Sequence, residues 1–301
     1  MAVSRVWLVP VAAFVLITST VVITYAIAVL NDHVSAFLPY ISDIAARAPE
    51  SCIFGQLLNM SALLVGLCIY WRHRQIVGFY GSIHKSVGRW RTVSVTLMQI
   101  GFLSAAGMSI AANFQEINFK QMHFIGIFFM FFFGIAYLWG QAIFSYRMKP
   151  QMQSPVMLYT RAAVTVLATI FFFISMSTDY VGHIFSRGSH EKSKIISTTE
   201  KLHFSSSDSG YGARIVSTIS EWLMALCFSV VILSFASELR FAELKPLKLV
   251  LPGSRLARER SEAEATPAVD IFARDRSYTD ASGNVIFPSE PLPILANQLV
   301  H

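Results

Sequence analysis

The residues with the clearest chemical potential are six titratable side chains and one amide that lie beside long apolar runs. They are His33, Asp43, Glu50, Asn113, Glu116, His123 and Glu221. Histidine titrates near pH 6.5, so histidines grouped with carboxylates can change their charge in an acidic compartment. One hypothesis is that these residues form a polar layer that senses pH or binds a lipid head group or another small ligand.

A structural role is the alternative for the same residues. In that interpretation most of them are solvated loop residues, and one hydrogen bond between His123 and Glu221 fixes the packing of two helices. We prefer this interpretation, because single ion pairs inside a membrane are often structural. Glu221 is the most demanding residue of the set, since a carboxylate near the bilayer centre costs at least about 2.5–3.5 kcal/mol on insertion scales.

Other kinds of site lack a motif in the sequence. No HxxxH or CxxC spacing places metal ligands together, and there is no GxSxG motif and no Gly-rich phosphate loop. We therefore predict no metal site, no cofactor, no enzymatic activity and no binding to nucleic acid.

The composition indicates a membrane environment for the polar layer. The chain is 54% hydrophobic and only 14% charged, with a mean hydropathy of +0.52, whereas soluble domains are about 25% charged. Six apolar segments are long enough to cross a hydrocarbon core of about 30 Å as helices. They lie near residues 6–30, 52–71, 92–112, 122–146, 159–176 and 215–236. The predicted fold class is an all-α membrane protein, a six-transmembrane-helix bundle.

The first apolar segment has a second interpretation. Arg5 precedes a run that ends in Ala26-Ile27-Ala28, which resembles a cleavable secretory signal. Signal cores are usually about 7–15 apolar residues long. Because this run is longer, we expect a membrane anchor.

Lysine and arginine in the links between segments predict the orientation. The links after the second and fourth segments are basic, and we count Arg72 and Arg161 among their charges. The basic residues of the links after the first and third segments are only Arg47 and Lys120. We therefore predict that the basic links and both termini face the cytosol. The polar layer then faces the lumen or the outside, and the basic cytosolic face can attract anionic lipids.

The remaining regions are predicted from their composition. Residues 1–240 are expected to form the transmembrane domain, with the Ser-rich residues 177–214 as a long luminal loop. Residues 241–301 are charged and Pro-rich without apolar periodicity, so we predict a disordered cytosolic tail. Four amides within the apolar segments, at Gln56, Asn59, Gln99 and Gln141, are expected to hydrogen-bond to neighbouring helices.

Two short strings match sorting signals. Tyr80-Gly-Ser-Ile83 fits a tyrosine-based signal, and Glu290-Pro-Leu-Pro-Ile294-Leu295 is similar to an acidic dileucine signal. We expect both strings to be exposed and extended enough for an adaptor protein to bind, although such short patterns often occur by chance.

Several longer motifs carry a resemblance to a known family. The stretch NDHVSAFLPYISDIAARAPESCIFGQLLNMSALL from residue 31, IAANFQE at 110–116, His123 and ISEW at 219–222 together resemble the DRAM family of damage-regulated autophagy modulators. This family belongs to a broader Frag/DRAM/Sfk group of six-helix membrane proteins. The resemblance implies a lysosomal or endosomal protein that promotes autophagy and influences cell death. It also implies action through protein partners of the autophagy or trafficking machinery, and it supplies no catalytic residues.

Two other functions stay open at this point. The broader group and the basic cytosolic face also suggest a plasma-membrane scaffold for phosphoinositide-kinase assembly. A transporter for lipids or small molecules that uses the luminal polar layer is the third possibility. The loop after Asp179 and the C-terminal tail are longer than we expect for the family, which affects targeting and partners more than fold.

Overall fold

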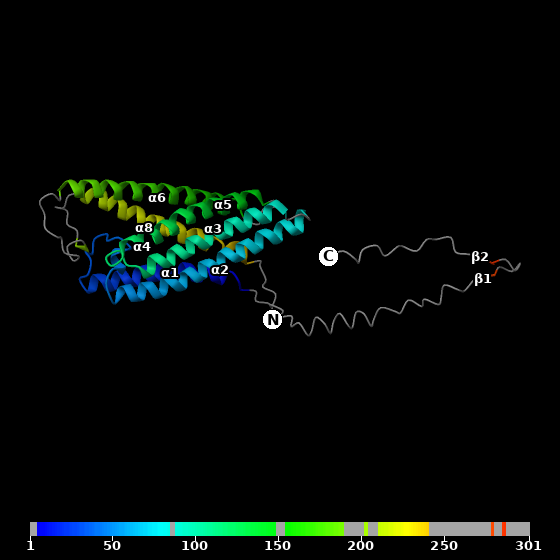
Figure 1. The fold of residues 1–301 in the computed structure, drawn as a ribbon, viewed down its shortest axis with the longest axis horizontal. Helices are drawn as coiled ribbons and strands as arrows, with labels where there is room; N and C mark the ends of the chain where they lie inside the picture. Colours follow the sequence, from blue (N-terminus) through cyan, green and yellow to red (C-terminus); the bar gives the residue numbers. More distant parts are fainter. Residues whose placement is uncertain are drawn as a thin grey trace. The chain divides into compact units, whose positions relative to one another are not determined.

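The computed structural model describes residues 5–84, 88–148, 154–189, 202–203, 210–240, 278–279 and 285–286. Within these residues, six helical spans are long and apolar enough to cross a membrane, which confirms the predicted fold class (Figure 1). The spans are α1 (Leu8–Leu30), α2 (Glu50–His84), α3 (Gly88–Asn113), the series α4 (Lys120–Phe128), η2 (Phe129–Phe133) and α5 (Gly134–Arg147), α6 (Pro155–Ser189), and α8 (Tyr211–Ser234) with α9 (Ala236–Leu239). A short 3-10 turn, η1 (Asp43–Ala45), lies between α1 and α2.

Residues 247–301 form a separate unit. Its described part is one antiparallel strand pair, β1 (Tyr278–Thr279) and β2 (Val285–Ile286), in which Tyr278 is opposite Ile286. The rest of this tail lies outside the described residues, so its disorder stays a prediction.

The helix ends differ from those expected from hydropathy. Helix α6 continues to Ser189 and α8 begins at Tyr211, so the predicted loop 177–214 is helical at both ends. Helix α2 likewise continues past Trp71 to His84. Hydropathy detects where a helix is apolar, whereas backbone hydrogen bonding can continue into a polar segment that contains good helix formers such as Arg and Gln.

Glycines allow the closest helix contacts. A Cβ atom added to Gly107 of α3 would collide with the backbone of Met130, and one added to Gly126 of α4 would meet the backbone of Ala111. The backbones of α3 and of the fourth span therefore touch, as at other small-residue crossings in membranes. Helices α6 and α8 form a second closely packed pair (Figure 1).

The fourth span contains a π-helical turn, η2. The hydroxyl of Ser104 on α3 donates a hydrogen bond of 2.7 Å to the Met130 carbonyl within this turn. The contact satisfies a backbone group that the altered turn exposes to the bundle interior. Such π turns are frequently found beside functional sites.

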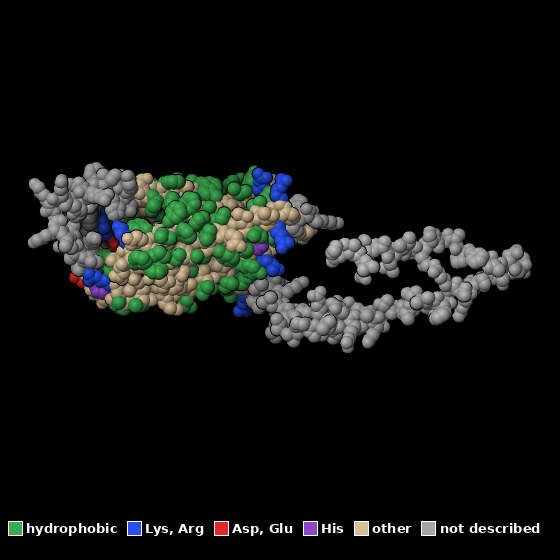
Figure 2. All heavy atoms as spheres, viewed as in Figure 1, with side chains coloured by type: hydrophobic (Ala, Val, Ile, Leu, Met, Phe, Trp, Pro, Cys, Tyr) green, Lys and Arg blue, Asp and Glu red, His purple; other side chains and the backbone are tan. Residues whose placement is uncertain are grey.

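The surface of the bundle separates apolar from basic side chains. Figure 2 shows a broad hydrophobic belt with a row of lysine and arginine side chains at one end, and a few basic side chains beside acidic and histidine ones at the other. The exposed basic residues at the first of these ends, which define the arginine end of the bundle, are Arg5, Arg74, Arg89, Arg91, Arg147 and Arg240. The opposite end carries the link between α1 and α2 and is called the first-loop end below. An apolar belt between two polar ends is the surface that a lipid bilayer requires.

Candidate functional site

The first polar cluster surrounds Glu50, which opens α2. One of its carboxylate oxygens, Oε1, accepts hydrogen bonds from Asn31 Nδ2 and from His33 Nδ1, each at 2.9 Å. Glu50 is fully buried, and its second oxygen has no hydrogen-bond partner among the described residues. The cluster ties the end of α1 to the start of α2.

The second cluster joins the first loop to α8. Arg214 Nη2 donates to Asp43 Oδ2 at 2.6 Å, and its guanidinium lies 4.9 Å from the centre of the Tyr40 ring. The pKa of the Asp43 carboxyl rises from 3.8 to about 7, mainly because of burial; Arg214 lowers this pKa, and the nearby Glu116 carboxylate raises it. Desolvation outweighs the ion pair here, so Asp43 changes its charge near neutral pH.

The third group connects the PYISD segment with the ISEW segment. The backbone amide of Ile41 donates to Glu221 Oε2 at 3.2 Å, and Trp222 Nε1 donates to the Pro39 carbonyl at 2.9 Å. The Nδ1 atom of His123 donates to the Phe114 carbonyl at 2.7 Å. His123 and Glu221 line the same cavity, and a direct hydrogen bond between them stays a prediction.

Asn113 and Glu116 lie at the same end but make separate contacts. The side chains of Asn59 and Asn113 exchange two amide hydrogen bonds of 3.0 Å, which confirms the expected interhelical bond of Asn59. Glu116 lies 3.9 Å from Lys120 in a partly exposed pair. The predicted layer is therefore several local clusters at one end of the bundle. In the described part of the chain, no three His, Cys, Asp or Glu side chains come together as metal ligands.

Sequence reasoning missed a buried charge network at the arginine end. Arg72, Arg161 and Glu238 are only 0%, 1% and 2% exposed. Arg72 Nη1 pairs with one Glu238 oxygen, and Arg161 Nη1 lies 3.0 Å from the other. Both guanidinium groups also lie over the Phe235 ring, at 5.1 and 4.9 Å from its centre. Two positive charges thus share one carboxylate and one aromatic ring.

Polar side chains from α2, α5 and α8 complete this network. Gln141 accepts from Arg72 Nε at 3.1 Å, which confirms its expected interhelical bond, and Gln75 accepts from Arg72 Nη1 at 2.6 Å. Ser145 and Ser234 accept hydrogen bonds from Arg161. The sequence interpretation counted both arginines as charges in the cytosolic links. Two signals pointed to the network: Gln141 and Ser145 lie one turn apart on one helix face, and Glu238 is the first acid after the last apolar run.

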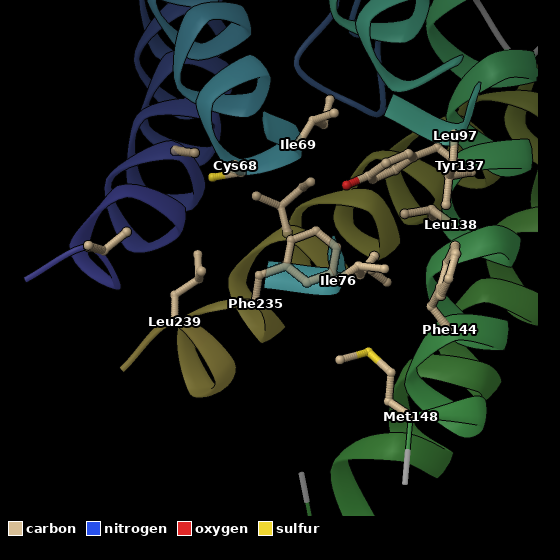
Figure 3. Close-up of a cluster of buried hydrophobic side chains, with 14 of the residues drawn as sticks. Cys68, Ile69, Ile76, Leu97, Tyr137, Leu138, Phe144, Met148, Phe235 and Leu239 are labelled. Carbon is tan, nitrogen blue, oxygen red and sulfur yellow. The ribbon is translucent and has the colours of Figure 1, made fainter. Parts of the chain in front are cut away.

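An elongated cavity lies inside the bundle between these two ends. Its volume is about 130 Å³, and its wall is almost entirely apolar. The first-loop end of the wall includes Gln115, His123 and Glu221, and the other end includes Tyr137. Figure 3 shows Tyr137 within the adjacent hydrophobic cluster, with its hydroxyl oxygen directed toward the middle of that cluster.

The proposed tyrosine sorting signal is not exposed. Tyr80 is 3% exposed within α2, and its ring stacks on Trp90 with the ring centres 4.9 Å apart. Ile83 belongs to the same helix. The expectation of an extended, accessible signal is therefore wrong here, because α2 continues to His84 and Tyr80 packs into the core. Glu290, Ile294 and Leu295 lie outside the described residues.

The fold and site define a multi-pass helical membrane protein whose first loop is hydrogen-bonded to its last span. Residues 5–241 match the Frag1/DRAM/Sfk1/Cwh43P N-terminal domain, and the chain belongs to this family. It is 32% identical over 238 residues to human DNA damage-regulated autophagy modulator protein 1, covering 77% of this chain and 91% of that protein. It is 28% identical to the Bos taurus modulator protein 2 (78% and 85% covered) and to the Danio rerio modulator of macroautophagy TMEM150B (77% and 85% covered). No solved structure matches the chain.

Proposed function

We propose that this protein is a lysosomal or endosomal membrane protein that modulates autophagy and influences cell death through protein partners rather than by catalysis. The observation that carries the proposal is the family match across the whole membrane domain, residues 5–241. The relatives with 28–32% identity are named as autophagy modulators. The segments that carry the resemblance, PYISD and ISEW, bond to each other through Ile41, Glu221, Pro39 and Trp222.

The proposal includes an orientation with the arginine end in the cytosol. Six exposed arginines lie at that end, and positively charged links favour the cytosolic side. The first-loop end then faces the lumen. There the raised pKa of Asp43, about 7, means that its carboxyl is protonated at the pH of 5–6 found in acidic organelles.

A plasma-membrane scaffold for phosphoinositide-kinase assembly is the second candidate function. The observation that favours it is the same group of exposed arginines, which can attract anionic lipids at about 1 kcal/mol per residue. Location separates the two functions, because the scaffold must act at the cell surface.

The test is expression of the full chain with a C-terminal tag in cells, with imaging and measurement of autophagic flux. We expect the tag to coincide with lysosomal or endosomal markers, and we expect expression to raise flux. Trp222→Phe should reduce the rise, because it removes the N–H group that bonds to Pro39. Trp139→Phe is the matched control, since it removes a similar N–H contact, to Thr169, away from the first loop.

Two results would contradict the proposal. A tagged protein that stays at the cell surface, even after endocytosis is blocked and released, would replace the first function by the scaffold. Equal flux with and without the expressed chain at a lysosomal location would remove the autophagy proposal.

A further inference from the structure

The cavity inside the bundle is a narrow apolar slot. On α8 its wall extends from Glu221 to Ile232, which is about 16 Å at 1.5 Å per residue. Ile41, Ser42 and Ala45 of the first loop form part of the wall. Apolar cavities of a similar volume, about 150 Å³, stay dry and take up small apolar molecules. A space that is long and narrow fits a hydrocarbon chain.

His123 brings a hydrogen-bond acceptor to the first-loop end of this wall. It lies with Gly126 on the buried face of α4, where Gly126 packs against α3, and it lines the cavity. Its Nδ1 atom donates to the Phe114 carbonyl, so in the neutral ring the other nitrogen, Nε2, has a free lone pair. Nε2 has no hydrogen-bond partner among the described residues, and it keeps some accessible surface. The wall therefore contains an accessible acceptor.

Glu221 adds an acid at the same end. It is the one acid among the described residues that line the cavity, and these residues include no lysine or arginine. Its Oε2 atom accepts from the Ile41 amide, and the two oxygens of a carboxylate together offer about four lone-pair sites. Carboxylates within membrane spans are most stable beside a positive charge. The chemistry of the first-loop end of the cavity therefore favours a ligand group that donates hydrogen bonds and is positively charged.

We propose that the cavity binds an amine that carries a single hydrocarbon chain. The chain occupies the apolar slot, and the ammonium group lies at the first-loop end beside His123 and Glu221. An ammonium group has three donors and no acceptor, so it matches two acceptors and compensates the charge of a carboxylate. An alcohol has only one donor and no charge, and a fatty acid carries the same charge as Glu221. This ligand goes beyond the proposed function, and its binding can be measured without reference to autophagy.

The test uses the full chain in phosphatidylcholine nanodiscs and radiolabelled octylamine as the probe. Binding to empty nanodiscs measures partition into lipid and is subtracted. We expect saturable binding of one octylamine per protein. Unlabelled octanol should displace it at least about ten times less effectively than unlabelled octylamine, because octanol lacks the charge-assisted hydrogen bonds, and octanoate should not displace it. Binding no greater than that to empty nanodiscs would overturn the proposal, and so would equal displacement by octanol and octylamine.

Two acid-to-amide variants locate the ammonium group. Glu221→Gln removes the charge but keeps a carbonyl oxygen for the Ile41 amide. It should weaken octylamine binding at least about tenfold, as expected for the loss of a hydrogen bond to a charged group, and bring the affinities for octylamine and octanol closer together.

Asp32→Asn is the matched control. It makes the same chemical change at an exposed residue of the first-loop end that does not line the cavity. Its φ of 53° is one that Asn adopts readily, so the variant should fold and bind octylamine like the wild type. If Glu221→Gln and Asp32→Asn bind octylamine alike, the ammonium group does not lie at Glu221 and the proposal is wrong.

Discussion

The buried charge network predicts a large loss of stability for Glu238→Gln. This change leaves the guanidinium groups of Arg72 and Arg161 buried without a counter-charge, while the shape of the side chain is kept. Removing one partner of a buried ion pair costs about 3–5 kcal/mol. The whole free energy of unfolding of a typical domain is only about 5–15 kcal/mol. We therefore expect Glu238→Gln to lose a large fraction of its stability.

A matched control and a charge-reducing variant sharpen this prediction. Glu116→Gln removes the same chemical group from a partly exposed pair with Lys120 at 3.9 Å, and exposed pairs contribute about 0–1 kcal/mol. Arg161→Met lowers the buried net charge from +1 to zero, whereas Glu238→Gln raises it to +2. The expected order of destabilisation is therefore Glu238→Gln, then Arg161→Met, then Glu116→Gln.

The purified variants are heated in one detergent, and size-exclusion chromatography measures the fraction that stays monodisperse at each temperature. The midpoint is the temperature at which half of the protein is lost from the monodisperse peak. Equal midpoints for Glu238→Gln and Glu116→Gln would show that the buried network does not stabilise the bundle. A larger loss for Arg161→Met than for Glu238→Gln would show that its serine hydrogen bonds matter more than charge balance.

Two further predictions concern the first loop and the helix crossings. The pKa of Asp43 is higher in the folded state (about 7) than its ordinary value of 3.8, so protonation favours folding. This stabilisation is complete below about pH 4 and is lost as the pH rises through about 7. Thermal midpoints of the wild type should fall between pH 5 and pH 8, and those of Asp43→Asn should fall less; an identical fall would contradict the role of Asp43. Gly107→Ala should destabilise the protein, because its Cβ collides with the Met130 backbone, whereas Gly78→Ala meets no atom within 4 Å and should stabilise α2 by about 0.5–1 kcal/mol. Equal midpoints for the two alanine variants would contradict a close crossing at Gly107.

The membrane-spanning segments could be predicted from the sequence, because a helix in contact with lipid must be apolar and hydropathy measures this property. All six predicted segments are helices, and Asn59 bonds across to α3 as expected. The helix ends were less predictable, since α2 and α6 continue through residues that are not apolar. A helix can continue beyond the apolar segment, because its backbone hydrogen bonds do not require apolar side chains.

The site was predicted only in part, because hydropathy indicates how deep a residue lies in the membrane but not which residues it contacts. It placed Asp43, Glu50 and Glu221 at one end of the bundle, but their partners Arg214, His33 and Ile41 depend on how the first loop folds. Arginines beside an apolar run are normally interpreted as charges in water. Arg72 and Arg161 are buried instead because Glu238 and the Phe235 ring, both distant in the sequence, meet them there.

The spacing of the two polar regions has a physical basis. Glu50 and Arg72 are both buried in α2 and lie about 33 Å apart along it at 1.5 Å per residue. This is close to the thickness of a hydrocarbon core, about 30 Å. Buried charges thus occur at its two boundaries, where snorkelling and water access make them less costly than at the centre.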